Sequence, residues 1–176
     1  MEHRVISQTL DLERSFVEPV VKAVLHTILF HRYFGNASVD NADVESTVNE
    51  KVDELMQSLS VSADSKSQIS LCFTETKPRR AWFSKSEEEI CWEEWTIYVN
   101  AKVHKTEREM GQLLASAQDQ AKRAIFRVIQ EMDKHKGHIP LIASNQTNPF
   151  PYHISIAPTS GIWSSMIKRA IRPGLS

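Results

Sequence analysis

The chain has 176 residues, a length typical of one domain, and its content of 41% hydrophobic and 24% charged residues is that of a globular protein. Its formal net charge of −1 provides no basic field, which disfavours a nucleic-acid-binding function. The longest apolar tract, residues 20–30, is too short to cross a bilayer and the first residues lack a signal-peptide pattern, so we expect a cytoplasmic protein without direct membrane insertion.

The first elements that the sequence predicts are a strand and a helix. Residues 5–12 alternate loosely between apolar and polar types, which indicates an edge strand. Ser15 and Glu18 then form a capping box, and Pro19 is tolerated because it falls in the first helical turn. A broad apolar stripe continues until Gly35, so this helix is expected to be largely buried.

The middle of the chain predicts a second helix and two strands joined by a long loop. Apolar residues recur at helical spacing over residues 44–59, and the Ser-rich stretch 58–67 predicts a loop. Alternation over residues 69–74 resumes over 95–103, which predicts two antiparallel, half-buried strands. Residues 77–91 break every periodicity, so we expect an exposed loop there.

The longest predicted element is a helix that begins at Thr106, where Glu109 completes a capping box, and ends at Gly137. At 1.5 Å per residue it is about 45 Å long, and we expect it to lie across the whole sheet. Small residues such as Ala117 and Ala124 on its apolar face would permit close packing.

The last predicted strand covers residues 152–156, and the tail at residues 158–176 fits either a short amphipathic helix or a strand. Together these elements predict an α+β fold, with residues 1–176 forming a single domain whose mainly antiparallel sheet packs against helices.

Catalytic and metal-binding patterns are absent from the sequence, so we predict a non-enzymatic protein without cofactors. His26 and His31 point apart on one helix, and Cys72 and Cys91 lack zinc-like spacing. Reduced thiols are therefore expected for both cysteines. An enzyme that uses Cys91 or a histidine stays open as an alternative.

Two adjacent aromatic residues, Trp82 and Phe83, lie within the predicted loop among Arg, Lys and Glu residues. One interpretation is that the loop folds back and buries one ring. The other is an exposed finger that supplies anchors for a partner, since aromatic residues with nearby arginines are concentrated in protein interfaces. We favour the finger.

Phe126 is the second aromatic residue without an expected place in the core. It lies on the outer face of the long helix beside Arg123, Arg127 and Gln130. An isolated exposed apolar residue would need no explanation, whereas a protein-binding surface would give it a function. Both interpretations stay open.

Five stretches, which come in the family's order, give the chain a resemblance to the autophagy-related protein 101 family. They are Ala-Val-Leu-His-Thr-Ile-Leu-Phe-His-Arg at 23–32, Gln-Ile-Ser-Leu at 68–71, Trp-Glu-Glu-Trp-Thr at 92–96, Met-Asp-Lys-His at 132–135 and Pro-Tyr-His-Ile-Ser at 151–155. The resemblance implies a HORMA fold and a heterodimer with autophagy-related protein 13, which this chain would stabilise. It also implies membership of the autophagy-initiation kinase complex at the phagophore assembly site, with no catalytic activity.

The resemblance also suggests binding residues. A Trp-Pro-Phe finger recruits downstream autophagy factors in the family, whereas this chain has Ala81-Trp82-Phe83, so Trp82 stands one position later. His31 and Arg32 are expected at the dimer surface. The short tail implies an open conformation that holds no peptide. A HORMA adaptor of a checkpoint or chromosome pathway, which clasps a peptide, is the alternative.

Overall fold

The computed structural model describes residues 3–33, 41–80, 85–103, 107–135, 137, 139–140 and 151–158. Within these ranges the elements follow the order β1 (Arg4–Glu13), α1 (Arg14–Tyr33), α2 (Asn41–Leu59), β2 (Asp64–Arg80), β3 (Lys85–Lys102), α3 (Glu107–Lys134) and β4 (Tyr152–Pro158). The long helix was predicted to begin at Thr106, which lies outside the described residues. The tail at residues 159–176 also lies outside them.

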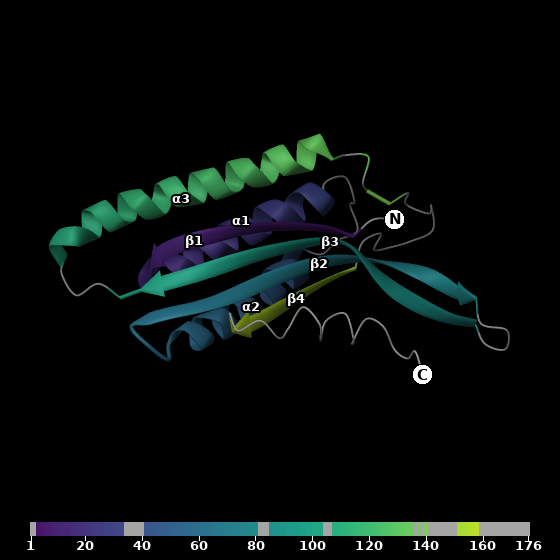
Figure 1. The fold of residues 1–176 in the computed structure, drawn as a ribbon, viewed down its shortest axis with the longest axis horizontal. Helices are drawn as coiled ribbons and strands as arrows, with labels where there is room; N and C mark the ends of the chain where they lie inside the picture. Colours follow the sequence, from purple (N-terminus) through teal and green to yellow (C-terminus); the bar gives the residue numbers. More distant parts are fainter. Residues whose placement is uncertain are drawn as a thin grey trace.

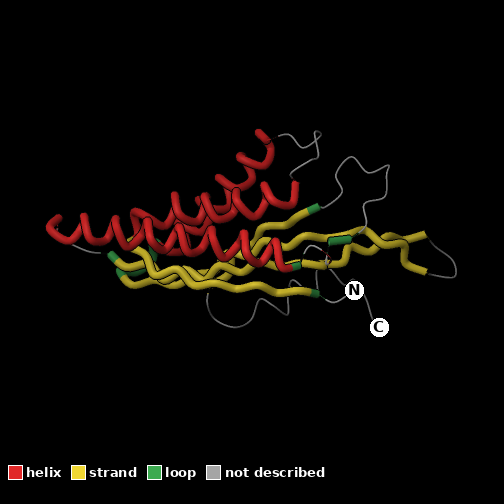
Figure 2. Tube along the Cα trace, turned by 90° about the horizontal axis from the view of Figure 1, so that it is seen from above, coloured by secondary structure: helices red, strands yellow, loops and turns green. Residues whose placement is uncertain are grey.

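The sheet has the strand order β1-β3-β2-β4, and the helices lie on one of its faces (Figures 1 and 2). Strand β2 pairs antiparallel with both β3 and β4, whereas β1 pairs parallel with β3. The predicted α+β class, with a mainly antiparallel sheet packed against helices, is confirmed. The expected edge position of the first strand is also confirmed.

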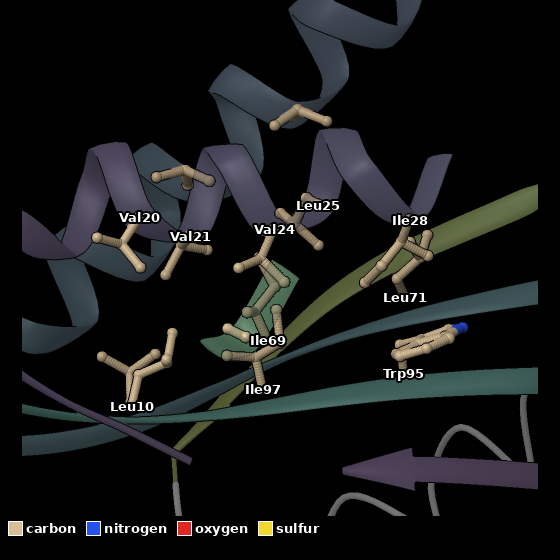
Figure 3. Close-up of a cluster of buried hydrophobic side chains, with 14 of the residues drawn as sticks. Leu10, Val20, Val21, Val24, Leu25, Ile28, Ile69, Leu71, Trp95 and Ile97 are labelled. Atoms are coloured by element: carbon tan, nitrogen blue, oxygen red, sulfur yellow. The ribbon is translucent and has the colours of Figure 1, made fainter. Parts of the chain in front are cut away.

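The core lies between α1 and the inner face of the sheet. Figure 3 shows Val21, Val24 and Leu25 of α1 above Ile69 of β2 and Ile97 of β3, and all five side chains are fully buried or nearly so. Burying an aliphatic side chain of this size contributes about 1.5 to 3 kcal/mol. The apolar stripe of α1 therefore anchors the sheet, as the sequence predicted.

The long helix α3 does not lie across the sheet, so that prediction is wrong. It packs against α1 and along the edge strand β1, and Ala117 and Ala124 are buried on its inner side. The reason is that only one of α1 and α3 can cover the centre of the sheet. The broadly apolar α1 takes the central position, while α3 has one narrow apolar stripe and is otherwise exposed.

The start of α1 is capped by a different residue from the one expected. The carboxylate of Glu13 accepts the Ser15 backbone N–H at 2.7 Å, and the Ser15 hydroxyl donates to the same oxygen. Glu18 instead accepts a hydrogen bond from Lys22 at 2.7 Å. A carboxylate at the first turn also interacts favourably with the helix dipole, so Glu13 performs the capping that the sequence pattern assigned to Ser15.

Both predicted loops contain strand residues. Residues 64–67, expected in a Ser-rich loop, begin β2. The expected exposed loop at residues 77–91 is instead a two-stranded arm, because β2 and β3 stay paired as far as Arg80 opposite Lys85. Neither β1 nor β4 pairs with this arm, and its sequence carries no apolar alternation. Residues 81–84, between the two strands, lie outside the described residues.

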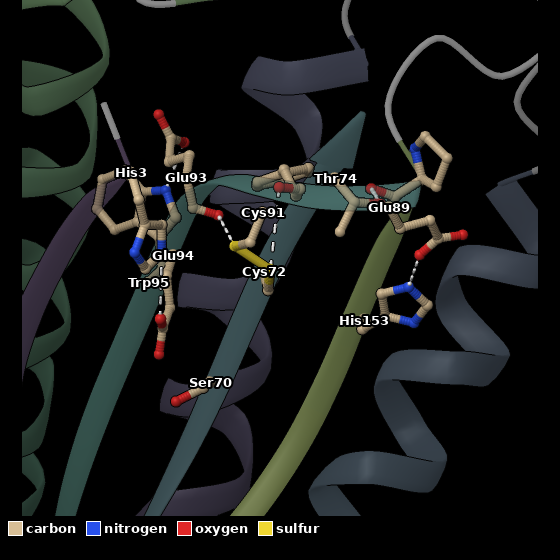
Figure 4. The surroundings of a disulfide bond; sticks show 12 residues. His3, Ser70, Cys72, Thr74, Glu89, Cys91, Glu93, Glu94, Trp95 and His153 are labelled. Carbon is tan, nitrogen blue, oxygen red and sulfur yellow. Dashed lines mark hydrogen bonds and ion pairs between the residues drawn. A yellow bond between two sulfur atoms is a disulfide. The ribbon is translucent and has the colours of Figure 1, made fainter. Parts of the chain in front are cut away.

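The two cysteines form a disulfide at the base of the arm, which contradicts the expectation of reduced thiols (Figure 4). Cys72 of β2 and Cys91 of β3 have Cα atoms 6.1 Å apart. The ladder shifts register between Phe73 and Thr74, which sets Cys91 opposite Thr74 and next to Cys72. The antiparallel pairing that brings the sulfurs together is invisible in a sequence spacing of 19 residues.

We expect the double variant Cys72→Ser/Cys91→Ser to unfold with a free energy about 2 to 3 kcal/mol lower than the oxidised wild type. The cross-link closes a short loop and so restricts the unfolded chain. Urea denaturation followed by circular dichroism measures the difference. Reduced wild-type protein should match the variant. If oxidised and reduced proteins have equal midpoints, the bond contributes nothing.

Candidate interaction surfaces

Three exposed apolar side chains lie toward the C-terminal ends of α1 and α3. Phe30 of α1 is 58% exposed and Phe126 of α3 is 61% exposed, and Ile129 of α3 is also exposed. The two helices pack against each other, and both end on the same side of the molecule (Figure 1). We call Phe30, His31, Phe126 and Ile129 the helix-end surface.

The exposure of Phe126 follows from its position on the helix. It lies two residues from both Ala124 and Val128, which are buried in the core. Two residues correspond to about 200° of helical rotation, so its side chain points away from the packed face. The prediction that Phe126 lies on the outer face of the long helix is confirmed, while its role in binding stays a prediction.

The sequence analysis did not single out Phe30, although its rotational position on the helix would have indicated an exposed side chain. It follows Ile28 and Leu29, which are buried, and it turns out of the apolar stripe toward solvent. Its ring lies edge-on to the exposed ring of His31, with centroids 5.7 Å apart. The structure therefore places the expected binding residue His31 beside a second exposed aromatic ring.

Arg32 does not lie on this surface, which corrects the expectation that it joins the dimer contact. Its side chain is 3% exposed and forms an ion pair with Glu93, which is fully buried. Arg32 Nε donates to Glu93 Oε1 at 2.9 Å and Nη2 donates to Oε2 at 2.5 Å. Such a bidentate pair fixes the end of α1 to β3 and leaves the guanidinium inaccessible to a partner.

Two tryptophans complete the surroundings of this ion pair. Trp95 Nε1 donates a hydrogen bond of 2.6 Å to Glu93 Oε1, which Figure 4 shows next to the disulfide. The Arg32 guanidinium lies over the ring of Trp92, 5.6 Å from its centroid. Trp92 and Trp95 are both buried, so they have the core role that the sequence predicted for them.

The two-stranded arm projects beyond its neighbours in the sheet (Figure 1). Strand β4 pairs with β2 only from Ser67 to Phe73, and β1 pairs with β3 only from Glu93 onward. Among the described residues, no further strand therefore flanks the arm. The predicted finger residues Trp82 and Phe83 lie outside the described residues, within the connection between its two strands.

Comparison with known proteins identifies the family. A sequence profile described as autophagy-related protein 101 matches residues 9–146. The chain belongs to the autophagy-related protein 101 family. A member from Arabidopsis thaliana is 26% identical over 94% of this chain and 93% of its own length, and one from Schizosaccharomyces pombe is 27% identical over 95% and 94%. A Xenopus tropicalis member is 25% identical over 95% of both chains.

Membership of the autophagy-related protein 101 family assigns the chain a role in autophagy. The three helices and the mostly antiparallel four-stranded sheet of the described ranges are consistent with a HORMA-like fold. The matched range includes α1, α3 and the arm. Both candidate surfaces therefore lie within the part of the chain that carries the family's sequence pattern.

Two titratable groups among the described residues have clearly shifted pKa values. Burial raises the pKa of the Tyr152 phenol, and a hydrogen bond with Thr47 partly opposes this. A hydrogen bond to Glu54 raises the pKa of Lys51 on α2. The Tyr152–Thr47 contact joins β4 to α2, whereas Lys51 and Glu54 both lie on α2. Neither arrangement brings a nucleophile to a base.

Cys91 has no free thiol that could act as a catalytic nucleophile, because its sulfur is bonded to Cys72. Within the described ranges, no group of three or more His, Cys, Asp or Glu side chains is arranged to hold a metal ion. Among the helices of those same ranges, none is both long and apolar enough to span a membrane.

Proposed function

We propose that the chain is a non-enzymatic scaffold of autophagy initiation. In this proposal it forms a heterodimer with the HORMA domain of autophagy-related protein 13, stabilises that partner, and recruits downstream factors through the tip of its arm. It acts in the cytoplasm and at the phagophore assembly site as a subunit of the initiation kinase complex. The family relationship supports the role in autophagy, and two surface features support the mode of binding.

The helix-end surface is the observation that carries the heterodimer proposal. Phe30 of α1 and Phe126 and Ile129 of α3 are exposed toward the C-terminal ends of these helices, while Met110 and Leu114 are exposed nearer the start of α3. Large aromatic side chains that the core leaves exposed are typical anchors of protein interfaces, where they fill pockets of the partner. Lys122 lies one helical turn before Phe126, and polar residues beside apolar anchors are common at interfaces.

The arm supports the recruitment proposal. The paired strands of the arm run as far as Arg80 and Lys85, and an ordered base of this kind lowers the entropic cost of presenting nearby side chains to a partner. Trp82 and Phe83 are in the four-residue connection at that tip. A dimer formed through the helices would leave the arm accessible, so the two surfaces can be tested separately.

The proposal predicts that Trp82→Ala/Phe83→Ala separates the two functions. We expect the variant to fold and to co-purify with the HORMA domain of autophagy-related protein 13 as wild type does. Because the tip supplies anchors for other factors, it should lose co-precipitation of downstream autophagy proteins and lower autophagic flux in starved cells.

The matched control is Val61→Ala, which shortens an exposed apolar side chain in the turn between α2 and β2. This control should retain every interaction. Failure of the Trp82→Ala/Phe83→Ala variant to fold would show that the rings belong to the core. Unchanged flux would exclude a recruiting finger, and a wild-type chain that does not bind the partner would exclude the heterodimer.

A further inference from the structure

A groove of about 390 Å³ lies between the free edge of β1 and α3. It shares no residue with the helix-end surface, and Ile129 and Arg127 are about 200° apart around the helix. The lining residues are Gln8, Thr9, Leu10, Asp11, Gln120, Arg123, Ala124 and Arg127. Neither the family relationship nor the proposed heterodimer accounts for this groove.

At one end of the groove, a side chain of α3 pairs with the strand edge. The Gln120 amide accepts the Asp11 backbone N–H at 2.9 Å, and its Nε2 donates to the Asp11 carbonyl oxygen at 2.5 Å. The amide thus makes both hydrogen bonds that a neighbouring strand would make. Since the bonding direction alternates along a strand, the backbone groups of Thr9 face the same free edge.

Inside the groove, Gln8 presents a donor without an acceptor. Its side chain is only 9% exposed, yet its Nε2 has no hydrogen-bond partner. Buried polar atoms are nearly always paired in folded proteins, and Gln8 Nε2 is itself almost inaccessible, so a rotation of the amide toward the groove would give this donor an external acceptor. The partner of Gln8 must therefore carry an oxygen acceptor.

The charges around the groove define that acceptor further. Arg127 makes no hydrogen bond or ion pair with any described residue, whereas Arg123 pairs with Asp119 at 2.8 Å. The one carboxylate in the lining, that of Asp11, accepts a hydrogen bond of 2.7 Å from Asn100 on the neighbouring strand. A free guanidinium and a free amide donor together favour a carboxylate.

We propose that this groove binds an extended, acidic segment of a partner protein. The segment adds to the free edge of β1 through main-chain hydrogen bonds with Thr9, and one carboxylate side chain accepts hydrogen bonds from Gln8 Nε2 and Arg127. A peptide is favoured over a small anion because the strand edge offers alternating donors and acceptors, which only another backbone matches.

Nuclear magnetic resonance titration of the full chain tests the proposal. The probe is a blocked eight-residue peptide of alternating Val and Thr with one central Glu, and the matched probe has Gln in place of Glu. We expect the Glu peptide to bind at least tenfold more tightly than the Gln peptide and to shift the Thr9 amide and Gln8 side-chain signals. Acetate alone should bind at least tenfold more weakly than the Glu peptide.

Two variants and a control locate the binding. Arg127→Gln and Gln8→Met should each weaken the Glu peptide about tenfold, whereas Lys66→Gln, an exposed cation on the outer face of β2, should not change its affinity. Equal binding of the Glu and Gln peptides, equal binding of acetate, or full affinity of Arg127→Gln would each overturn the proposal. No shift at Thr9 with any probe would overturn it as well.

Discussion

Replacing Glu93 by alanine should lower the free energy of unfolding by about 3 to 5 kcal/mol, the largest effect we expect for any polar substitution in this fold. The change leaves the guanidinium of Arg32, which is 3% exposed, without its counter-charge. It also removes the acceptor of Trp95 Nε1. A buried charge that loses its partner cannot regain water unless α1 moves, so the cost falls on the folded state.

Chemical denaturation of four proteins separates the ion pair from its surroundings. Glu93→Ala and Arg32→Met measure the two single losses, and Arg32→Met/Glu93→Leu replaces the pair by apolar groups of similar size. The double variant should be more stable than Glu93→Ala, because it buries no lone charge. Glu18→Ala, which breaks the exposed pair with Lys22, should cost less than about 0.5 kcal/mol. A Glu93→Ala cost near that of Glu18→Ala would mean that water reaches Arg32.

This ion pair illustrates which parts of the fold the sequence could predict. The apolar residues of α1 and α2 recur at helical spacing, so these helices and their buried faces were predictable from the sequence alone. Arg32 and Glu93 are 61 residues apart, and nothing in the local sequence of either reveals the other. The family resemblance therefore placed Arg32 at the dimer surface, and no local pattern contradicted it.

The arm and the groove were unpredictable for different reasons. In the sheet, residues 74–80 and 85–91 pair only with each other, and their sequence lacks the apolar alternation by which a strand is recognised. The groove depends on where α3 lies relative to β1, and the sequence predicted that α3 crosses the sheet. Gln8 and Arg127 are adjacent to one space only because α3 runs along the edge strand instead.

Among the candidate binding residues, the outward position of Phe126 was predictable and its function was not. Helical phase alone places its side chain opposite the buried Ala124 and Val128. Whether an exposed ring binds a partner depends on the surface of that partner, which this chain does not encode. A direct measurement of binding is therefore needed.

We expect Phe126→Asp to weaken the heterodimer with autophagy-related protein 13 by about 1,000-fold, equivalent to about 4 kcal/mol. The substitution removes an aromatic anchor and places a carboxylate where the partner would exclude water, and burying an unpaired charge is costly. Phe126 is 61% exposed, so the fold itself should lose no more than about 0.5 kcal/mol. Calorimetric titration of the partner's HORMA domain measures the affinity.

The matched control for this prediction is Val61→Asp, which makes the same change of apolar to acidic residue at an exposed position in the α2–β2 turn. Its affinity should equal that of the wild type. Phe126→Ala should give an intermediate loss, because it removes the anchor without adding a charge. If Phe126→Asp binds as tightly as Val61→Asp, the helix-end surface is not the dimer contact, and the partner must bind another face.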